Sequence, residues 1–383
     1  MGVQTVIDHR NDPINDNTSS EFVSADHVLI SSGKVDNESD FSKYYAIGLT
    51  QRIDYRDSRP VITQGEIGSN STLVLMGEAQ KSLSLNKTII KGNSLLYALY
   101  YAKYRLETNT DYLPLSGVIN QGQDMPSSND YGADDVIGGA DIILAVRRLA
   151  GGGDNIDNLD AIGLTQGFQL SSNMPVTQLS EMGTHARFIL SGKADKAMTF
   201  SRVMLRGKSA LAALYGLSGS MKIIQDLQRD TFRTPKDIFL IFINKANTEP
   251  ETIITLEKSV IGSIGSQNTA GAQSTMENLS LSWNKTRYGD SEGIPKNTVG
   301  ADAYGIGGSN IWLDLDHRIF RQPFNLLLTY CDADDNVLAH QILSRAMMAS
   351  IGRTFAAGSY TTTEGGSLSW EKTITLDVNG VEI

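Results

Sequence analysis

The hexapeptide Ala46-Ile47-Gly48-Leu49-Thr50-Gln51 occurs a second time as residues 161–166. When both copies are extended, residues 46–100 align without a gap to residues 161–215, at an offset of 115 (161 − 46), and 20 of the 55 aligned positions are identical. A gapless match of this length indicates an internal duplication, which has to be recognised before a fold is assigned.

A weaker repeat follows downstream, where residues 281–286 return as residues 368–373 at an offset of 87 (368 − 281). Ile-Gly pairs at 261–262 and 351–352 are separated by 90 residues, which predicts an alignment with gaps. We call the copies of the first repeat A (46–100) and A′ (161–215), and those of the second repeat B (around 281–286) and B′ (around 368–373). Their order along the chain is A, A′, B, B′. If A and B are halves of one domain, the simplest arrangement nests one domain inside the other, because the alternative makes the connections cross.

Local patterns predict a mainly β (α+β) fold. Residues 45–56 and 61–67 are strand-like runs separated by a polar turn, and residues 72–90 are expected to form two strands around Gly77. Ser94 and Ser209 precede apolar residues at helical spacing and are good N-caps. Each domain is therefore expected to be an antiparallel β-sandwich or barrel with one packed helix. Open sheet edges then need cover, charge or another subunit.

Composition excludes several classes of protein. The chain has 383 residues, a formal net charge of −10 and one cysteine, so a disulfide framework and a Cys-based metal site are excluded. No apolar stretch reaches the roughly 18 residues of a membrane span. The N-terminus lacks a signal-peptide pattern, which predicts a reducing compartment. The acidic balance argues against a general nucleic-acid binder.

The negative charge is concentrated in two segments. Residues 1–40 carry 8 acidic and 2 basic side chains, and residues 106–160 carry 10 acidic and 2 basic ones, so together they hold −14 of the charge. The remaining residues carry a net +4 (−10 + 14). These two segments are therefore expected to lie outside the repeated core and to contact partners.

Motifs for chemistry are incomplete. Residues 206–209 end like a phosphate-binding loop but lack its first glycine, and residues 332–343 lack the glycine and glutamate of a calcium loop. A polar cluster at 314–317 has no second histidine at ligand spacing. Trp283 and Trp370 occupy equivalent strand positions and are expected to be core anchors. We find no nucleophile with a base, and predict no enzyme, no metal and no cofactor.

Residues 47–51, the following strand, Pro60 and then residues 64–69 (Gln-Gly-Glu-Ile-Gly-Ser) resemble the opening of bacteriophage tail-tube proteins. They are also similar to the related baseplate hubs and contractile secretion tubes. This resemblance implies a virion structural protein that is assembled in the host cytoplasm and placed in the tail. Its stacked rings would make a channel through which phage DNA passes without sequence-specific binding.

For a chain with two such domains, the resemblance implies a trimeric ring with pseudo-sixfold symmetry, with a hexamer as the alternative, and no membrane partner is expected. Sheath, hub and terminator proteins are the other implied partners. The duplicated turn residues are the expected subunit-interface residues: Pro60, Glu66, Gly68, Pro175, Glu181 and Gly183. The expected segments are an acidic arm (1–40), the first half of the outer domain (41–105), an acidic insertion (106–160), the inner domain (161–290), a linker (291–317) and the second half of the outer domain (318–383).

Three alternatives remain open at this point. The first is a low-copy baseplate hub or tube-initiator ring, which copy number per particle separates from a tube subunit. The second is a carbohydrate-binding adhesin module, which glycan binding would support. The third is a hydrolase that uses Asp314, Asp316 and His317.

Overall fold

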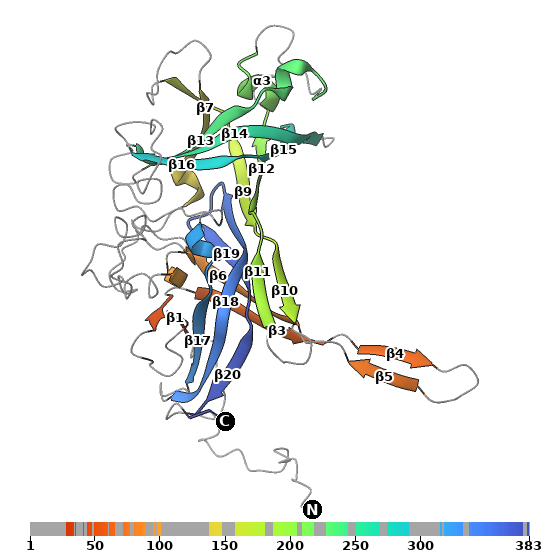
Figure 1. The fold of residues 1–383 in the computed structure, drawn as a ribbon. Helices are drawn as coiled ribbons and strands as arrows, with labels where there is room; N and C mark the ends of the chain where they lie inside the picture. Colours follow the sequence, from red (N-terminus) through yellow and green to blue (C-terminus); the bar gives the residue numbers. More distant parts are fainter. Residues whose placement is uncertain are drawn as a thin grey trace, which may run out of the picture.

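The computed structural model of the chain is a mainly antiparallel β protein (Figure 1). The structure describes residues 28–33, 35, 41, 44–47, 50–59, 61–65, 72–76, 80–88, 95–96, 98–100, 138–147, 158–180, 187–204, 209–217, 227–243, 250–267, 274–290, 315, 318–331, 337–377 and 381–382. Within these residues no helix is long and apolar enough to cross a membrane.

One group of strands, here called the terminal unit, comes from both ends of the chain. Its strands are β1 (Val28–Gly33), β2 (Tyr45–Ala46), β3 (Thr50–Ser58), β4 (Val61–Gly65), β5 (Thr72–Met76), β6 (Gln80–Thr88), β17 (Phe324–Cys331), β18 (Val337–Ala356), β19 (Thr363–Ser369) and β20 (Lys372–Leu376). Residues 95–96 and 98–100 are helical, and the 3-10 turn η12 (Arg318–Arg321) precedes β17.

The second group, the central unit, lies between these in the sequence. Its strands are β7 (Ile142–Arg147), β8 (Leu159–Ala161), β9 (Thr165–Asn173), β10 (Val176–Ser180), β11 (Arg187–Ser191), β12 (Asp195–Val203), β13 (Lys236–Ile243), β14 (Pro250–Gln267), β15 (Met276–Ser282) and β16 (Lys285–Asp290). It also holds the 3-10 turns η7 (Gly139–Asp141) and η10 (Asp230–Arg233) and helix α3 (Ala210–Leu214).

The strands of the two units pair in the same pattern. In the terminal unit, β6 pairs with β3 and β19, and β19 pairs with β18. In the central unit, β12 pairs with β9 and β15, and β15 pairs with β14. The offsets are 115 for β3 and β6 and 87 for β19, as in the sequence repeats. The pairings therefore join β6 with β19 in the terminal unit and β12 with β15 in the central unit.

The long strands β14 and β18 each bend from one sheet into another. The first half of β14 pairs with β13 and β16, and its second half pairs with β15. At the bend, Lys258 has φ 51° and its counterpart Arg345 has φ 54°, which is the left-handed region. Asp237 Oδ1 accepts from Lys258 N (2.9 Å), and Asn325 Oδ1 accepts from Arg345 N (3.0 Å). The bend therefore has the same construction in both units.

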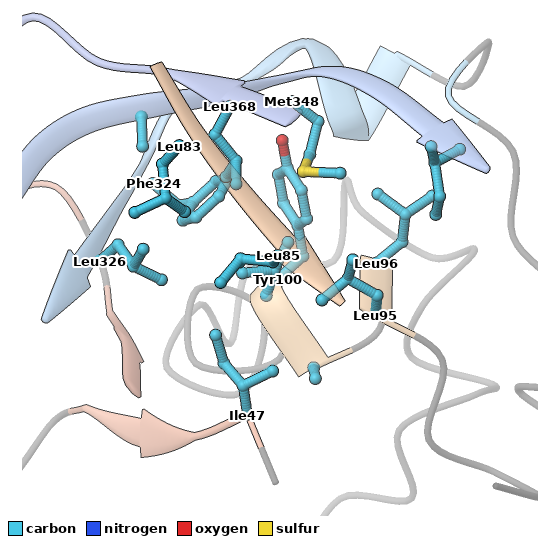
Figure 2. Packing of buried hydrophobic residues seen from close by; sticks show 14 of the residues in the cluster. Ile47, Leu83, Leu85, Leu95, Leu96, Tyr100, Phe324, Leu326, Met348 and Leu368 are labelled. Atoms are coloured by element: carbon cyan, nitrogen blue, oxygen red, sulfur yellow. The ribbon is translucent and has the colours of Figure 1, made fainter. Parts of the chain in front are cut away.

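Each unit encloses its own apolar core. Alternating Leu83 and Leu85 of β6 point into the core of the terminal unit, where Figure 2 shows them together with Tyr100 and Leu368. Phe200 and Leu279 belong to the core of the central unit. Burial of a large apolar side chain stabilises the fold by about 1.5–3 kcal/mol, so the strand faces with period-2 apolar residues determine the inward side.

The core includes segments that the sequence placed outside it. Within 1–40, β1 pairs with β17, and within 106–160, β7 pairs with β13 and with β8. Leu144 and Val146 are buried in the core of the central unit. The expectation that both acidic segments lie outside the repeated core is therefore wrong for these strands. These strands are short apolar runs inside acidic segments, so their strand pattern is weak in the sequence.

The second repeat also needs no gap. Ser263 pairs with Ser280, and Ser350 pairs with Ser367, each pair at an offset of 87 from the other. The counterpart of residues 351–352 is therefore 264–265, a second Ile-Gly pair, and not 261–262. The gapped alignment expected from the sequence is wrong because two Ile-Gly pairs stand three residues apart in β14.

Candidate assembly interface

Among the described strands, one pair connects the sheets of the two units. Residues 350–356 of β18 run antiparallel beside residues 167–173 of β9, so that Ser350 lies opposite Asn173 and Phe355 opposite Phe168. The rings of Phe168 and Phe355 stack with their centroids 4.5 Å apart. The joined sheet has eight strands in the order β3-β6-β19-β18-β9-β12-β15-β14, with β3 at one end and residues 260–267 of β14 at the other.

These two ends are the counterparts of the strands that meet inside the chain. β3 corresponds to β9 at an offset of 115, and the second half of β14 corresponds to the second half of β18 at an offset of 87. Among the described residues, β3 pairs only with β6, and residues 260–267 pair only with β15. Each end thus has a row of backbone N–H and C=O groups that a further strand could pair with.

Side-chain exposure differs between the inner junction and the open ends. Leu170 of β9 is 2% exposed, whereas its counterpart Tyr55 in β3 is 41% exposed. Met347 of β18 is 3% exposed, whereas its counterpart Val260 in β14 is 44% exposed. These two positions are therefore apolar in both units, buried in β9 and β18 but accessible in β3 and β14.

One face of the eight-stranded sheet is lined by small neutral side chains. Representative residues from five strands are Ser84, Gly352, Thr354, Gln169, Thr199 and Ser280. An open hollow of about 630 Å³ lies over the part of this face that β18, β9, β12, β15 and β14 form, so the face is concave there. Charge on this face is concentrated on β3, where Arg52 pairs with Asp54 at 2.8 Å.

On the opposite face, a buried glutamate connects each sheet to its helix. Glu364 of β19 accepts from the backbone N–H of Leu95 and pairs with Arg353 at 2.6 Å. Its counterpart Glu277 of β15 accepts from the N–H of Ala210 at 2.9 Å and lies 3.5 Å from Arg202 Nε. A carboxylate at a helix start satisfies an N–H that the helix leaves unpaired. No sequence signal singled out these glutamates.

No protein-family model matches the chain. No curated protein sequence matches it either. Its structural neighbours are phage tail-tube, baseplate and contractile injection system tube and terminator proteins.

A chain from the anti-feeding prophage baseplate is 15% identical, with 44% of this chain and 99% of that chain covered and a TM-score of 0.31. A chain from the cap that terminates the anti-feeding prophage tube is 15% identical, with 45% and 98% covered and a TM-score of 0.30. The SPP1 tail tube is 11% identical, with 40% and 79% covered and a TM-score of 0.29.

The turn residues expected at the interface flank two β-hairpins, β4–β5 and β10–β11. Of these residues only Pro175 lies in the described part of the chain, where it is exposed and its carbonyl accepts from Gly192 N at 2.8 Å. Pro60, Glu66, Gly68, Glu181 and Gly183 lie outside the described residues. Their role at an interface remains a prediction.

The structure places the other singled-out residues in the fold. Trp283 and Trp370 are buried, and their indole N–H groups donate to Thr286 and Thr373, so both are core anchors as expected. Ser209 caps α3 by accepting from Ala212 N. Residues 205–208, 314, 316–317 and 332–336 lie outside the described residues. Within the described ranges no group of three or more His, Cys, Asp and Glu side chains could hold a metal ion.

Proposed function

We propose that the chain is a non-enzymatic, ring-forming structural protein of a phage tail or a related contractile tube. One observation carries this proposal: the chain contains a closed junction between two units, and its sheet ends in two open edges that are counterparts of the strands in that junction. A sheet that repeats this junction between copies continues from copy to copy, and a constant rotation at each junction closes it into a ring.

The duplication sets the proposed number of copies. Each chain supplies two units, which we propose to be nested duplicated domains, so three chains supply six units around a threefold axis. The internal and intermolecular junctions then alternate around the ring. A closed ring leaves no open edge in the sheet, which removes the aggregation hazard that exposed edges create.

The concave face is the proposed channel wall. The hollow over Thr199, Thr354 and Ser280 gives this face the curvature of a lumen, while the cores and helices lie on the opposite face. Most of this wall consists of hydroxyl and amide groups, and the charges that β3 adds are of both signs, so the wall neither attracts nor repels a polyanion strongly and DNA would pass without binding to particular residues. Rings of this kind would stack on each other and contact sheath, hub and terminator proteins in the virion tail.

The experiment that tests this function is native mass spectrometry of the purified full-length chain, combined with negative-stain microscopy. We expect a three-copy species and ring-shaped particles with threefold averages. A chain that stays monomeric at high concentration and joins no tail particle would overturn the proposal. Glycan binding by the monomer would instead favour an adhesin, and one ring per particle would favour a hub or initiator over a repeating tube subunit.

A further inference from the structure

We infer that two copies of this chain join by repeating the internal junction residue for residue. Residues 260–267 of β14 in one copy lie antiparallel beside β3 of the next copy, with Ser263 opposite Ser58, Gly265 opposite Arg56 and Gln267 opposite Asp54. This inference rests on the proposed ring and adds the contacting surfaces, the partner, which is a second copy, and the register.

The register follows from the internal junction. Ser350 lies opposite Asn173, Gly352 opposite Ser171 and Thr354 opposite Gln169. The offset of 87 converts the β18 member of each pair into its β14 counterpart, and the offset of 115 converts the β9 member into its β3 counterpart. The three intermolecular pairs result directly.

Contacts on both strands support these offsets. The hydroxyls of Ser263 and Ser280 are 2.6 Å apart, and those of Ser350 and Ser367, each 87 residues later, are 2.7 Å apart. On the other strand, Ser58 lies opposite Gln80, and their counterparts Asn173 and Asp195 lie opposite each other in the same way. The open strands therefore have the positions relative to their neighbours that the joined strands have.

The chemistry of the two edges suits this pairing. Residues 259–267 of β14 contain no charged side chain, whereas β3 carries Arg52, Asp54, Arg56 and Asp57. Charged residues on an edge strand oppose indiscriminate pairing. A neutral partner with glycine at Gly265, opposite Arg56, leaves room for these charges to remain in solvent while the backbones pair. Pairing would also cover the accessible apolar side chains of Tyr55 and Val260.

The two hairpins extend the same inference. The β10–β11 hairpin follows β9, and Val176 at its start packs against the core of the terminal unit, where Met174 N donates to Ala349 O at 2.7 Å. The β4–β5 hairpin follows β3 in the same way, but Figure 1 shows it projecting away from the rest of the chain. Val61, the counterpart of Val176, is 58% exposed.

The β4–β5 hairpin is therefore placed on the central unit of the next copy, just as β10–β11 lies on the terminal unit of its own chain. The counterpart of Ala349 is Gly262, so the start of the hairpin is expected to lie beside Gly262 of the next copy. Hairpin and edge strand then bind the same neighbour, because they are consecutive in the sequence.

Cysteine cross-linking tests the register. One chain carries Ser263→Cys and a second carries Ser58→Cys, and the two are mixed and oxidised. Directly opposite residues of antiparallel strands have Cα atoms about 4.5–5.5 Å apart, within disulfide range, so we expect a covalent dimer only in the mixture. The single native cysteine, Cys331, is buried. A chain with both Ser350→Cys and Asn173→Cys is the matched control and should form an intrachain disulfide.

A mixture of Ser263→Cys with Asp54→Cys is the out-of-register control, since a shift of four residues separates the Cα atoms by about 13 Å. Rings that form while the Ser263–Ser58 pair stays uncross-linked, with the intrachain control oxidised, would overturn this inference and leave the proposed function standing. The absence of both rings and cross-links would overturn the two together.

The hairpin contact has its own test. Val61→Ser should raise the concentration needed for half-assembly by about tenfold, the loss expected for one buried valine. Val381→Ser is the matched control, because Val381 is 61% exposed and lies near the C-terminus. Equal assembly of the two variants would contradict the hairpin contact.

Discussion

Glu364 in the terminal unit and Glu277 in the central unit occupy equivalent positions but meet different cations. Glu364 pairs with Arg353, and its charge also acts on Lys87. Glu277 lies beside Arg202, the counterpart of Lys87. Arg353 has Ser266 as its counterpart in β14. The additional arginine thus belongs to the part of β18 that pairs with β9.

This difference separates a permanent junction from an open one. A buried ion pair costs desolvation energy, and it stabilises the fold only when its geometry and hydrogen bonds are good. Arg353 meets this condition through two contacts to the same carboxylate oxygen, at 2.6 and 2.7 Å. The open edge has a neutral serine at this position, so a strand can bind there without first desolvating a cation.

The largest expected effect comes from removing the charge of Glu364. Glu364→Gln leaves Arg353 and Lys87 buried without their counterion and should lower the free energy of unfolding by about 3–5 kcal/mol. Glu277→Gln should cost less, since one cation is affected rather than two. Urea denaturation of the two variants measures the difference. Glu371→Gln, whose partner Arg345 is half exposed, is the control, with an expected loss of at most about 1 kcal/mol.

The next effect is a pH dependence confined to the terminal unit. Burial lowers the pKa of Lys87 to about 8, against the opposing influence of Glu364. Between pH 8 and 10.5 the unfolded chain binds more protons at this lysine than the folded chain, so the free energy of unfolding should rise with pH by up to roughly 3 kcal/mol. Arg202 stays protonated throughout this range and gives no such rise.

Lys87→Met should abolish this rise. The measurement is the urea midpoint of the wild type and of the variant at pH 7.5 and at pH 10. Other lysines and tyrosines titrate in both proteins, so their contribution cancels in the comparison. An identical pH dependence of the two midpoints would show that Lys87 is not held in a cation-destabilising environment.

The smallest expected effect concerns a contact that the two units share. Thr373→Val removes the acceptor of the Trp370 indole N–H, and Thr286→Val removes that of Trp283. Each should cost about 1–2 kcal/mol, because a buried donor loses its partner. Thermal denaturation should show equal losses in both units, with the exposed Thr375→Val as a near-neutral control. Unequal losses would show that the repeat is not equivalent at the tryptophans.

The strands of the repeated segments were predictable from the sequence. Leu83 and Leu85 alternate with Ser82 and Ser84, and this period fixed both the strand and its inward face. The Ser209 cap and the two tryptophan anchors were predictable for similarly local reasons. Identity at a fixed offset made the repeat visible over 55 residues without any knowledge of the structure.

The junction was not predictable in this way. The pairing of Phe355 with Phe168 joins residues that are 187 positions apart (355 − 168), and no local pattern specifies such a partner. Glu364 and Glu277 lie in otherwise ordinary strands, and only the tertiary structure brings each to a helix start. The strands β1 and β7 were missed because short apolar runs within acidic surroundings give a weak signal.

The strands β18 and β9 belong to the same chain, and this changes how a ring would assemble. Every second junction forms within one molecule, where a tether gives an effective concentration in the millimolar range even when the protein itself is dilute. Six units therefore need only three encounters between molecules. Because the two fused units can diverge in sequence, adjacent positions around such a ring also need not be chemically alike, so an asymmetric partner could distinguish three positions from the other three.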